Sequence, residues 1–551
     1  MKNRLRPLWA PIALVVALAS QAPAQVSGEV RDLATMAPVE GAIVSLQATT
    51  TRTTTAADGS FSLPGASGAG LVIVAANKGH YNASTLVTSP TTGVQILLEA
   101  VPVMDNSAYT FLDPVNCGMC HQDQLNEWTS SPMALAGQNT WVYDIYNGTG
   151  SPGGMGGFVY TRDSVFAHSN PASECGACHQ PEPWVANPHT PLEDINALSV
   201  GSIHGISCEI CHKVAHIDEN KVNYPGIYEG AVTLSRPHGI DQVEYGVLGD
   251  SDVYMGPMRA SYQPQLTAAM CAACHQDKND PDEDGDFEEA NGVISEPTYL
   301  EWLATPYADP ADPLAATCVT CHMPATDATR ASNMPSAPDR EQGTIRLHQI
   351  LGTTPEFLDN SCELEVKPRL TAGGSLEVDV SVTNTGVGHH VPTGVTVRNL
   401  ILLVEAFRVS DGVTMASTGT QLVHDLGGVG DPALGYYAGQ PGKLFAKVNH
   451  DAAGNGPTFY TDATGIQWDN RIPALATDTS HYSFTVPPGS GEVRVRARLI
   501  YRRAFRAFVD AKQWTTDGHG NPLEDVAAPY YGHLMEEKTA RVNSPAAAIR
   551  R

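Results

Sequence analysis

The chain has 551 residues, of which 42% are hydrophobic and 17% charged, and its formal net charge is −26. This length exceeds what one hydrophobic core usually organises, so we expect about three domains. The acidic balance argues against nucleic acid as a partner and favours a protein that stays soluble at high concentration.

Residues 1–24 have the pattern of a secretory signal peptide. Lys2, Arg4 and Arg6 form a basic start, residues 12–19 are apolar, and Ala22-Pro-Ala24 is a small-residue cleavage site. In the rest of the sequence no segment approaches the roughly eighteen apolar residues of a membrane span. We therefore expect an exported protein without a membrane span, in the periplasm, the extracellular space or at the cell surface.

Residues 25–101 consist of short alternating runs separated by turn residues, which predicts a β-sandwich with strands at 26–30, 42–46, 60–63, 71–74 and 94–98. The segment resembles the carboxypeptidase regulatory-like domain through Pro38-Val-Glu-Gly-Ala42 and Asp58-Gly-Ser-Phe61. This resemblance implies a small prealbumin-like sandwich with no catalytic role.

Residues 102–351 contain one pentapeptide pattern, Cys-x-x-Cys-His, five times. In chain order the five motifs are Cys117-Gly-Met-Cys120-His121, Cys175-Gly-Ala-Cys178-His179, Cys208-Glu-Ile-Cys211-His212, Cys271-Ala-Ala-Cys274-His275 and Cys318-Val-Thr-Cys321-His322. The pattern attaches c-type haem: two thiols one helical turn apart form thioethers with the haem vinyl groups, and the next imidazole reaches the iron. Disulfides or zinc sites would not place a histidine after the second cysteine in all five cases. The sequence thus predicts five covalent haems, in a domain where haems replace much of the side-chain core.

The residues around the later motifs resemble the multihaem c-type cytochrome family. The resemblance is carried by Gly205-Ile-Ser-Cys-Glu-Ile-Cys-His-Lys213, Glu296-Pro-Thr-Tyr-Leu-Glu-Trp302 and Cys318-Val-Thr-Cys-His-Met-Pro324, among others. It implies electron transfer and a central domain of helix and coil with little regular structure.

Each motif supplies one axial ligand, so the function depends on the sixth ligand of each iron. The stronger candidates are His216, His238, His348 and His389, followed by His168 and His204, with His189 and His390 also available. Met133 and Met258 could instead ligate an iron through sulfur, although a core position is the simpler interpretation of each.

An acidic stretch in the same region matches the first half of a calcium-binding loop. Its carboxylates are Asp280, Asp282, Asp284, Asp286 and Glu288, placed around Gly285. The twelfth position is Asn291 instead of the bidentate Glu. The sequence leaves a bound calcium ion and a solvated acidic loop as equal alternatives.

Residues 358–542 return to alternation, with strands expected at 376–382, 400–404 and 493–499, and predict a second, larger β-sandwich before a tail at 543–551. Gly388-His-His-Val-Pro-Thr-Gly394 and Asp469-Asn-Arg-Ile472 resemble sequences that follow the haem region in the same cytochrome family. That resemblance, with the turn that Pro392 and Gly394 favour, makes His389 a ligand candidate from outside the haem region.

These observations predict an exported pentahaem cytochrome that relays electrons between redox proteins or to extracellular acceptors. Two alternatives remain open. One is a reductase or oxidase in which an open haem site acts on a small nitrogen or sulfur compound. The other is a homopolymer, in which the chain is the subunit of an extracellular cytochrome filament.

Overall fold

The computed structural model describes residues 25–543 except 103, 165–173, 222, 224–230, 253, 256–257, 282–286 and 289. The predicted signal peptide, His168, and Asp282, Asp284 and Asp286 of the acidic stretch lie outside the described residues. Within the described residues, no helix is long and apolar enough to cross a membrane. The chain divides into two compact units, residues 1–100 with 249–252, and residues 101–248 with 253–551.

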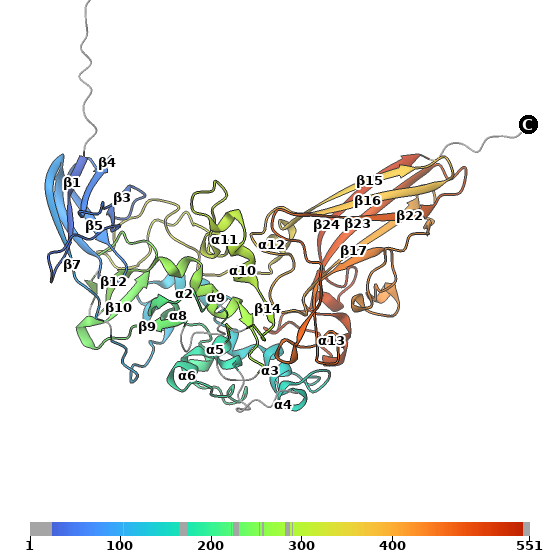
Figure 1. Ribbon diagram of the computed structural model, residues 1–551, viewed down its shortest axis with the longest axis horizontal. Helices are drawn as coiled ribbons and strands as arrows, with labels where there is room; N and C mark the ends of the chain where they lie inside the picture. Colours follow the sequence, from blue (N-terminus) through green and yellow to red (C-terminus); the bar gives the residue numbers. More distant parts are fainter. Residues whose placement is uncertain are drawn as a thin grey trace, which may run out of the picture. The chain divides into compact units, whose positions relative to one another are not determined.

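The first unit contains two small sheets that share one core (Figure 1). One sheet has the order β4 (Ser60–Pro64), β1 (Gln25–Asp32), β7 (Thr91–Leu98), with β1 parallel to β7. The other has the order β3 (Arg52–Thr54), β2 (Ile43–Leu46), β5 (Gly68–Ala76), β6 (Ala83–Ser89), all antiparallel. The five strands predicted in this segment are confirmed, whereas its resemblance to the carboxypeptidase regulatory-like domain stays a prediction.

Because the core of the first unit lies within residues 26–98, a fragment of residues 25–101 should fold without haem. It would lose the hydrogen bonds that the Ala48 and Asn82 nitrogens and the Ser84 hydroxyl donate to residues 249–252. Each contributes about 1 kcal/mol, which is small against a closed core. A dispersed NMR spectrum of the fragment is the expected result, and a spectrum of a disordered chain would contradict this boundary.

The part of the second unit that precedes β15 (Cys362–Leu370) contains the five motifs and is called the haem region below. It has little regular structure, as predicted. Its helices are four to eight residues long: α1 (Pro114–Gly118), α2 (Gln122–Thr129), α3 (Thr140–Tyr146), α4 (Tyr160–Asp163), α5 (Cys175–His179), α6 (Pro181–Ala186), α7 (Val200–Ile203), α8 (Cys208–His212), α9 (Ala269–His275), α10 (Thr298–Leu303), α11 (Cys318–His322) and α12 (Pro355–Asp359). Several of them begin at a side-chain N-cap. The side chain of Asp113 accepts a hydrogen bond from a backbone amide at the start of α1, and that of Asn139 does so at the start of α3.

Short strands join these helices. They are β8 (Val214–Ile217) with β9 (Val232–Leu234), β10 (Val243–Gly246) with β12 (Met258–Tyr262) and β11 (Tyr254–Met255), and β13 (Asp277–Lys278) with β14 (Ile294–Glu296). The same region contains the 3-10 turns η1 (Ala136–Gln138) and η3 (Pro264–Thr267).

The C-terminal region of the second unit is built mainly from two four-stranded sheets (Figure 1). The first has the order β15 (Cys362–Leu370), β16 (Ser375–Asn384), β22 (Thr477–Thr485), β18 (Ala416–Ser417), and the second the order β19 (Gly442–Phe445), β17 (Asn399–Arg408), β23 (Glu492–Arg502), β24 (His533–Asn543). A two-stranded sheet, β20 (Lys447–His450) with β21 (Gly465–Asp469), and helix α13 (Arg506–Lys512) complete it. The three strands predicted here are confirmed, because β16 and β23 alternate buried and less buried residues and β17 is buried along most of its length.

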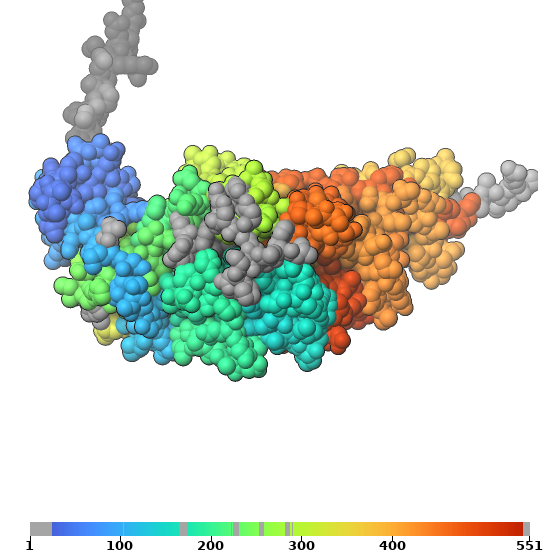
Figure 2. Space-filling view, turned by 60° about the horizontal axis from the view of Figure 1, so that its bottom comes forward, coloured from blue at the N-terminus to red at the C-terminus, as the bar shows by residue number. Residues whose placement is uncertain are grey.

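Polar groups from the haem region and the C-terminal region meet in a buried cluster. The Lys512 ammonium donates to the carbonyls of Asp144 (2.5 Å) and Gly154 (2.7 Å), and the Trp514 indole donates to the Asp144 carboxylate (2.7 Å). Trp514 also stacks on Trp141, with ring centres 3.9 Å apart. Figure 2 shows the corresponding teal and red segments side by side on the surface. Haem region and C-terminal sheets are therefore one packed body.

Candidate haem centres

All five Cys-x-x-Cys-His motifs form helical turns. Helices α5, α8 and α11 begin at the first cysteine and end at the histidine, α9 ends at His275, and in the first motif the His121 amide donates to the Cys117 carbonyl (2.9 Å). Residues at i, i+3 and i+4 lie on one face of a helix. Both thiols and the imidazole of each motif thus share a face, as covalent haem attachment requires.

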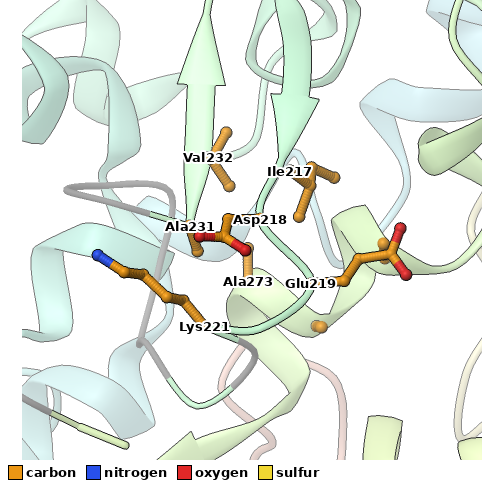
Figure 3. Close-up of a pocket in the computed structure, with 9 residues that line it drawn as sticks. Ile217, Asp218, Glu219, Lys221, Ala231, Val232 and Ala273 are labelled. Atoms are coloured by element: carbon orange, nitrogen blue, oxygen red, sulfur yellow. The ribbon is translucent and has the colours of Figure 1, made fainter.

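The two residues between the cysteines lie on another face of each helix. In the second, third and fourth motifs both of them are buried: Gly176, Ala177, Glu209, Ile210, Ala272 and Ala273. In α9 this face lines a small pocket under the β8–β9 hairpin, where Ile217 and Val232 lie above Ala273 (Figure 3). Protein packing therefore fixes the rear of these helices and leaves the cysteine–histidine face for the cofactor.

Backbone and carboxylate oxygens hold the motif imidazoles at Nδ1. Nδ1 of His121 lies 2.7 Å from the Ala331 carbonyl oxygen, that of His179 3.2 Å from Ala136, that of His212 2.5 Å from Tyr245, and that of His322 2.5 Å from Leu351. Nδ1 of His275 lies 3.6 Å from the Glu296 carboxylate. Such partners place the proton on Nδ1 and leave the Nε2 lone pair for a metal.

Two motif histidines face a second histidine across a short gap. The ring centres of His212 and His348 are 6.5 Å apart with planes at 17°, and those of His322 and His389 are 6.4 Å apart with planes at 7°. With metal–nitrogen bonds of about 2 Å and about 1.1 Å from nitrogen to ring centre, two imidazoles on opposite sides of one iron have centres about 6.2 Å apart. The centre-to-centre distances of both pairs match this spacing.

His348 is held by the loop that follows the fifth motif. Its amide donates to the Glu127 carboxylate (2.7 Å), and its Nδ1 lies 2.9 Å from the Arg346 carbonyl oxygen, so Nε2 is left for a metal. Burial, and then the neighbouring His212, lower the pKa of His348 to about 4. The ring is therefore neutral at pH 7, the state in which imidazole binds a metal.

His389 belongs to the turn between β16 and β17, and a buried ion-pair network holds this turn against α10. The Glu301 carboxylate lies 2.6 Å from Nη1 of Arg471 and accepts hydrogen bonds from the His390 amide (3.2 Å) and the Thr393 hydroxyl (2.8 Å). Nδ1 of His389 lies 2.9 Å from the His390 carbonyl oxygen. Burial lowers the pKa of His389 to about 4, so this ring too is neutral at pH 7.

The motifs also pack against one another. Helix α5 packs on α9, with the Cys178 sulfur 4.0 Å from the Ala273 carbonyl oxygen, and Cys318 packs on the cluster of Ala268, Ala272 and Tyr299. Hydrogen bonds from thiols of another motif lower the pKa of three thiols: Cys117 acts on Cys208, Cys178 on Cys274 and Cys271 on Cys318. The first motif is therefore next to the third, and the fourth is next to both the second and the fifth.

The remaining predicted ligands have other surroundings. His216 is an exposed residue of β8, and Nδ1 of the exposed His238 lies 3.2 Å from the Asn106 side-chain nitrogen. His204 lies between Glu182 (3.4 Å) and Asp113 (3.8 Å), and Nδ1 of His390 lies 3.5 Å from Glu301. The ring of His189 packs edge-on against Trp184. None of these contacts tests whether the five histidines bind an iron, so their role as ligands stays a prediction.

In the acidic stretch, Glu288 binds protein groups. Its carboxylate accepts hydrogen bonds from the Asn223 amide (2.9 Å) and side chain (2.5 Å). Among the described residues, no group of three or more histidine, cysteine, aspartate or glutamate side chains could hold a metal ion. A calcium site at Asp280 to Glu288 stays a prediction, since three of its carboxylates are not described.

One histidine, in a turn that is hydrogen-bonded to Thr140 and Trp141, was missed from the sequence. His519 lies in the C-terminal region, and its Nδ1 is buried without a hydrogen-bond partner. The available signal was local: Asp517-Gly-His-Gly-Asn521 is a tight-turn sequence that presents a histidine between two glycines, much as Gly388 precedes His389.

Comparison with known proteins finds similarity in structure only. No protein-family model matches the chain, and no curated protein matches it. Among solved structures, the chain is similar to a penta-heme cytochrome c552 from Thermochromatium tepidum, with 20% sequence identity and a TM-score of 0.51. The match covers 78% of this chain and 99% of that one. At this identity the likeness is one of fold.

Proposed function

We propose that this protein is a pentahaem cytochrome c that relays electrons between redox partners outside the cytoplasm. The ten motif cysteines would hold five haems covalently, and His121, His179, His212, His275 and His322 would be their proximal ligands. Haem iron supplies the redox chemistry by cycling between its ferric and ferrous states. The fold shared with a penta-heme cytochrome supports this proposal.

The observation that carries the proposal is the geometry of the two facing imidazole pairs, His212 with His348 and His322 with His389. At these two motifs, an iron with an imidazole on each side would have no position left for a substrate, which favours electron transfer over catalysis there. Backbone oxygens hold the Nδ1 atoms of all four rings, which supports ligands that would stay in place when the iron changes its oxidation state.

The packing of the motifs supports a relay. The first motif lies next to the third, and the fourth next to the second and fifth. Burial, and then the charge of Cys274, raise the pKa of Cys211 to about 12, which supports a third motif close to the fourth. Exposed Met119 and Cys321, in the first and fifth motifs, favour these two as points of electron exchange with partners.

Covalent stoichiometry tests the proposal. The mature protein should carry five haems, measured by intact mass and by a pyridine haemochrome assay, and its N-terminal residue should be Gln25 if residues 1–24 are a signal peptide. The double variant Cys318→Ala/Cys321→Ala should carry four, because its fifth motif lacks both thiols. Four or fewer haems in the fully matured natural protein would contradict the proposal.

A further inference from the structure

The turn at residues 517–521 of the C-terminal region is held by several hydrogen bonds of its own. The Asp517 carboxylate accepts hydrogen bonds from the amides of His519 (3.0 Å) and Asn521 (2.9 Å). The Asp517 amide donates to the Asn521 carbonyl (2.8 Å), and Gly520 closes the turn at φ 86°. The backbone of His519 is therefore fixed on both sides.

This turn docks on the segment 136–141 of the haem region. The Gly518 carbonyl accepts a hydrogen bond from the Thr140 amide (2.9 Å), and the Trp141 indole donates to the Thr516 carbonyl (2.9 Å). The contact is close, because a Cβ at Gly518 would lie 2.0 Å from the Asn139 side-chain oxygen. Glycine at 518 is what allows the turn to reach the haem region.

The same segment holds the second motif. Nδ1 of His179 lies 3.2 Å from the Ala136 carbonyl oxygen, and the Gln180 side chain donates to the Gly137 carbonyl (3.2 Å). Residues 136–141 are thus a short bridge with His179 at one end and the 517–521 turn at the other. Burial lowers the pKa of His179, and the charge of His519 acts in the same direction.

The imidazole of His519 has an unused nitrogen. Its Nδ1 is buried and has no hydrogen-bond partner, whereas Nδ1 of His348 and of His389 each lies within 2.9 Å of a carbonyl oxygen. A buried polar atom without a partner costs about 1–3 kcal/mol unless something outside the chain satisfies it. A metal is such a partner for a neutral imidazole.

We propose that His519 is the second axial ligand of the haem iron bound to His179, with the Asp517–Asn521 turn as its positioning element. The inference rests on the proposed function, since it needs a haem at the second motif. With it, the C-terminal region supplies a pair of ligands, His389 for the fifth motif and His519 for the second. The neutral imidazole binds the iron by donating its lone pair, and no proton is transferred.

The test is the spin state of the purified full-length holoprotein. The variant His519→Ala should keep five haems, convert one of them from low spin to high spin in the electron paramagnetic resonance spectrum, and gain one carbon monoxide site. His519→Met should restore the low-spin state through sulfur and raise the potential of that haem. His533→Ala is the matched control, because His533 lies in the same region but its ring binds Glu524 (3.1 Å) and Asp359 (2.8 Å).

Each outcome separates the two proposals. Fewer than five haems in the natural protein would contradict the proposed function. Five haems with an unchanged low-spin spectrum in both His519→Ala and His519→Met would overturn the assignment of His519 alone. The double variant His519→Ala/His389→Ala should contain two high-spin haems, and a count of one would mean that both residues act on the same haem, which also overturns the assignment.

Discussion

The variants His348→Ala and His389→Ala should each convert one low-spin haem to high spin while all five haems stay attached. Each ring lies about 6.4–6.5 Å, centre to centre, from a motif histidine, the spacing expected across one iron. Removing one imidazole leaves that iron five-coordinate and open to carbon monoxide. Electron paramagnetic resonance and carbon monoxide titration, normalised to the haem content, measure the change.

Because the two histidines face different motifs, their effects should add. The double variant His348→Ala/His389→Ala should bind two equivalents of carbon monoxide per protein molecule. His238→Ala serves as a control, since His238 is exposed and its Nδ1 lies beside Asn106. If both His348→Ala and His389→Ala leave the low-spin spectrum unchanged, the facing imidazoles are not iron ligands. The main observation that supports the proposed function would then be lost.

The variant Arg471→Ala should lower the free energy of unfolding by about 3–5 kcal/mol, because it leaves a buried carboxylate without its partner. The side chains of Arg471 and Glu301 are 4% and 5% exposed, and their closest atoms are 2.6 Å apart. Since Glu301 also anchors His390 and Thr393, the turn that carries His389 should loosen, and some of the haem at the fifth motif should become high-spin. Urea unfolding and the optical spectrum measure the two effects.

An exposed ion pair provides the control. Arg541 and Glu492 are 59% and 33% exposed and 2.9 Å apart, so Arg541→Ala should cost at most about 1 kcal/mol. The double variant Arg471→Met/Glu301→Gln should recover some of the stability, because it removes the unpaired charge. Equal losses for Arg471→Ala and Arg541→Ala would show that the Glu301 network does not hold the turn.

The eight strands expected in the two outer segments and the helical turns of the five motifs could be predicted from the sequence because their signals are local. The alternation at 376–382 and 493–499 needs only the two-residue period of a strand, and both segments form strands. The motif residues need only one helical turn, since both thiols and the imidazole come from five consecutive positions. Such patterns can be recognised in the sequence because they do not depend on contacts with distant residues.

The pairing of each motif histidine with a second histidine could not be predicted, because only folding brings the two residues together. His348 and His389 were candidates, but nothing in the sequence assigns the first to His212 and the second to His322. His216 and His238 had equal standing and lie exposed. The burial that keeps His348 and His389 neutral is likewise a property of the folded chain.

By itself, the sequence determined five helical turns, each with two thiols and an imidazole on one face, because that chemistry is contained in five adjacent residues. Only the tertiary structure decided which motifs are neighbours, which imidazoles face each other, and that the C-terminal sheets contribute His389 beside a motif and place His519 on the bridge to His179. The physical reason is that two facing imidazoles have to meet a distance of a few ångströms and have no sequence spacing to keep. Any rigid turn that the fold brings close to a motif can therefore provide the second imidazole.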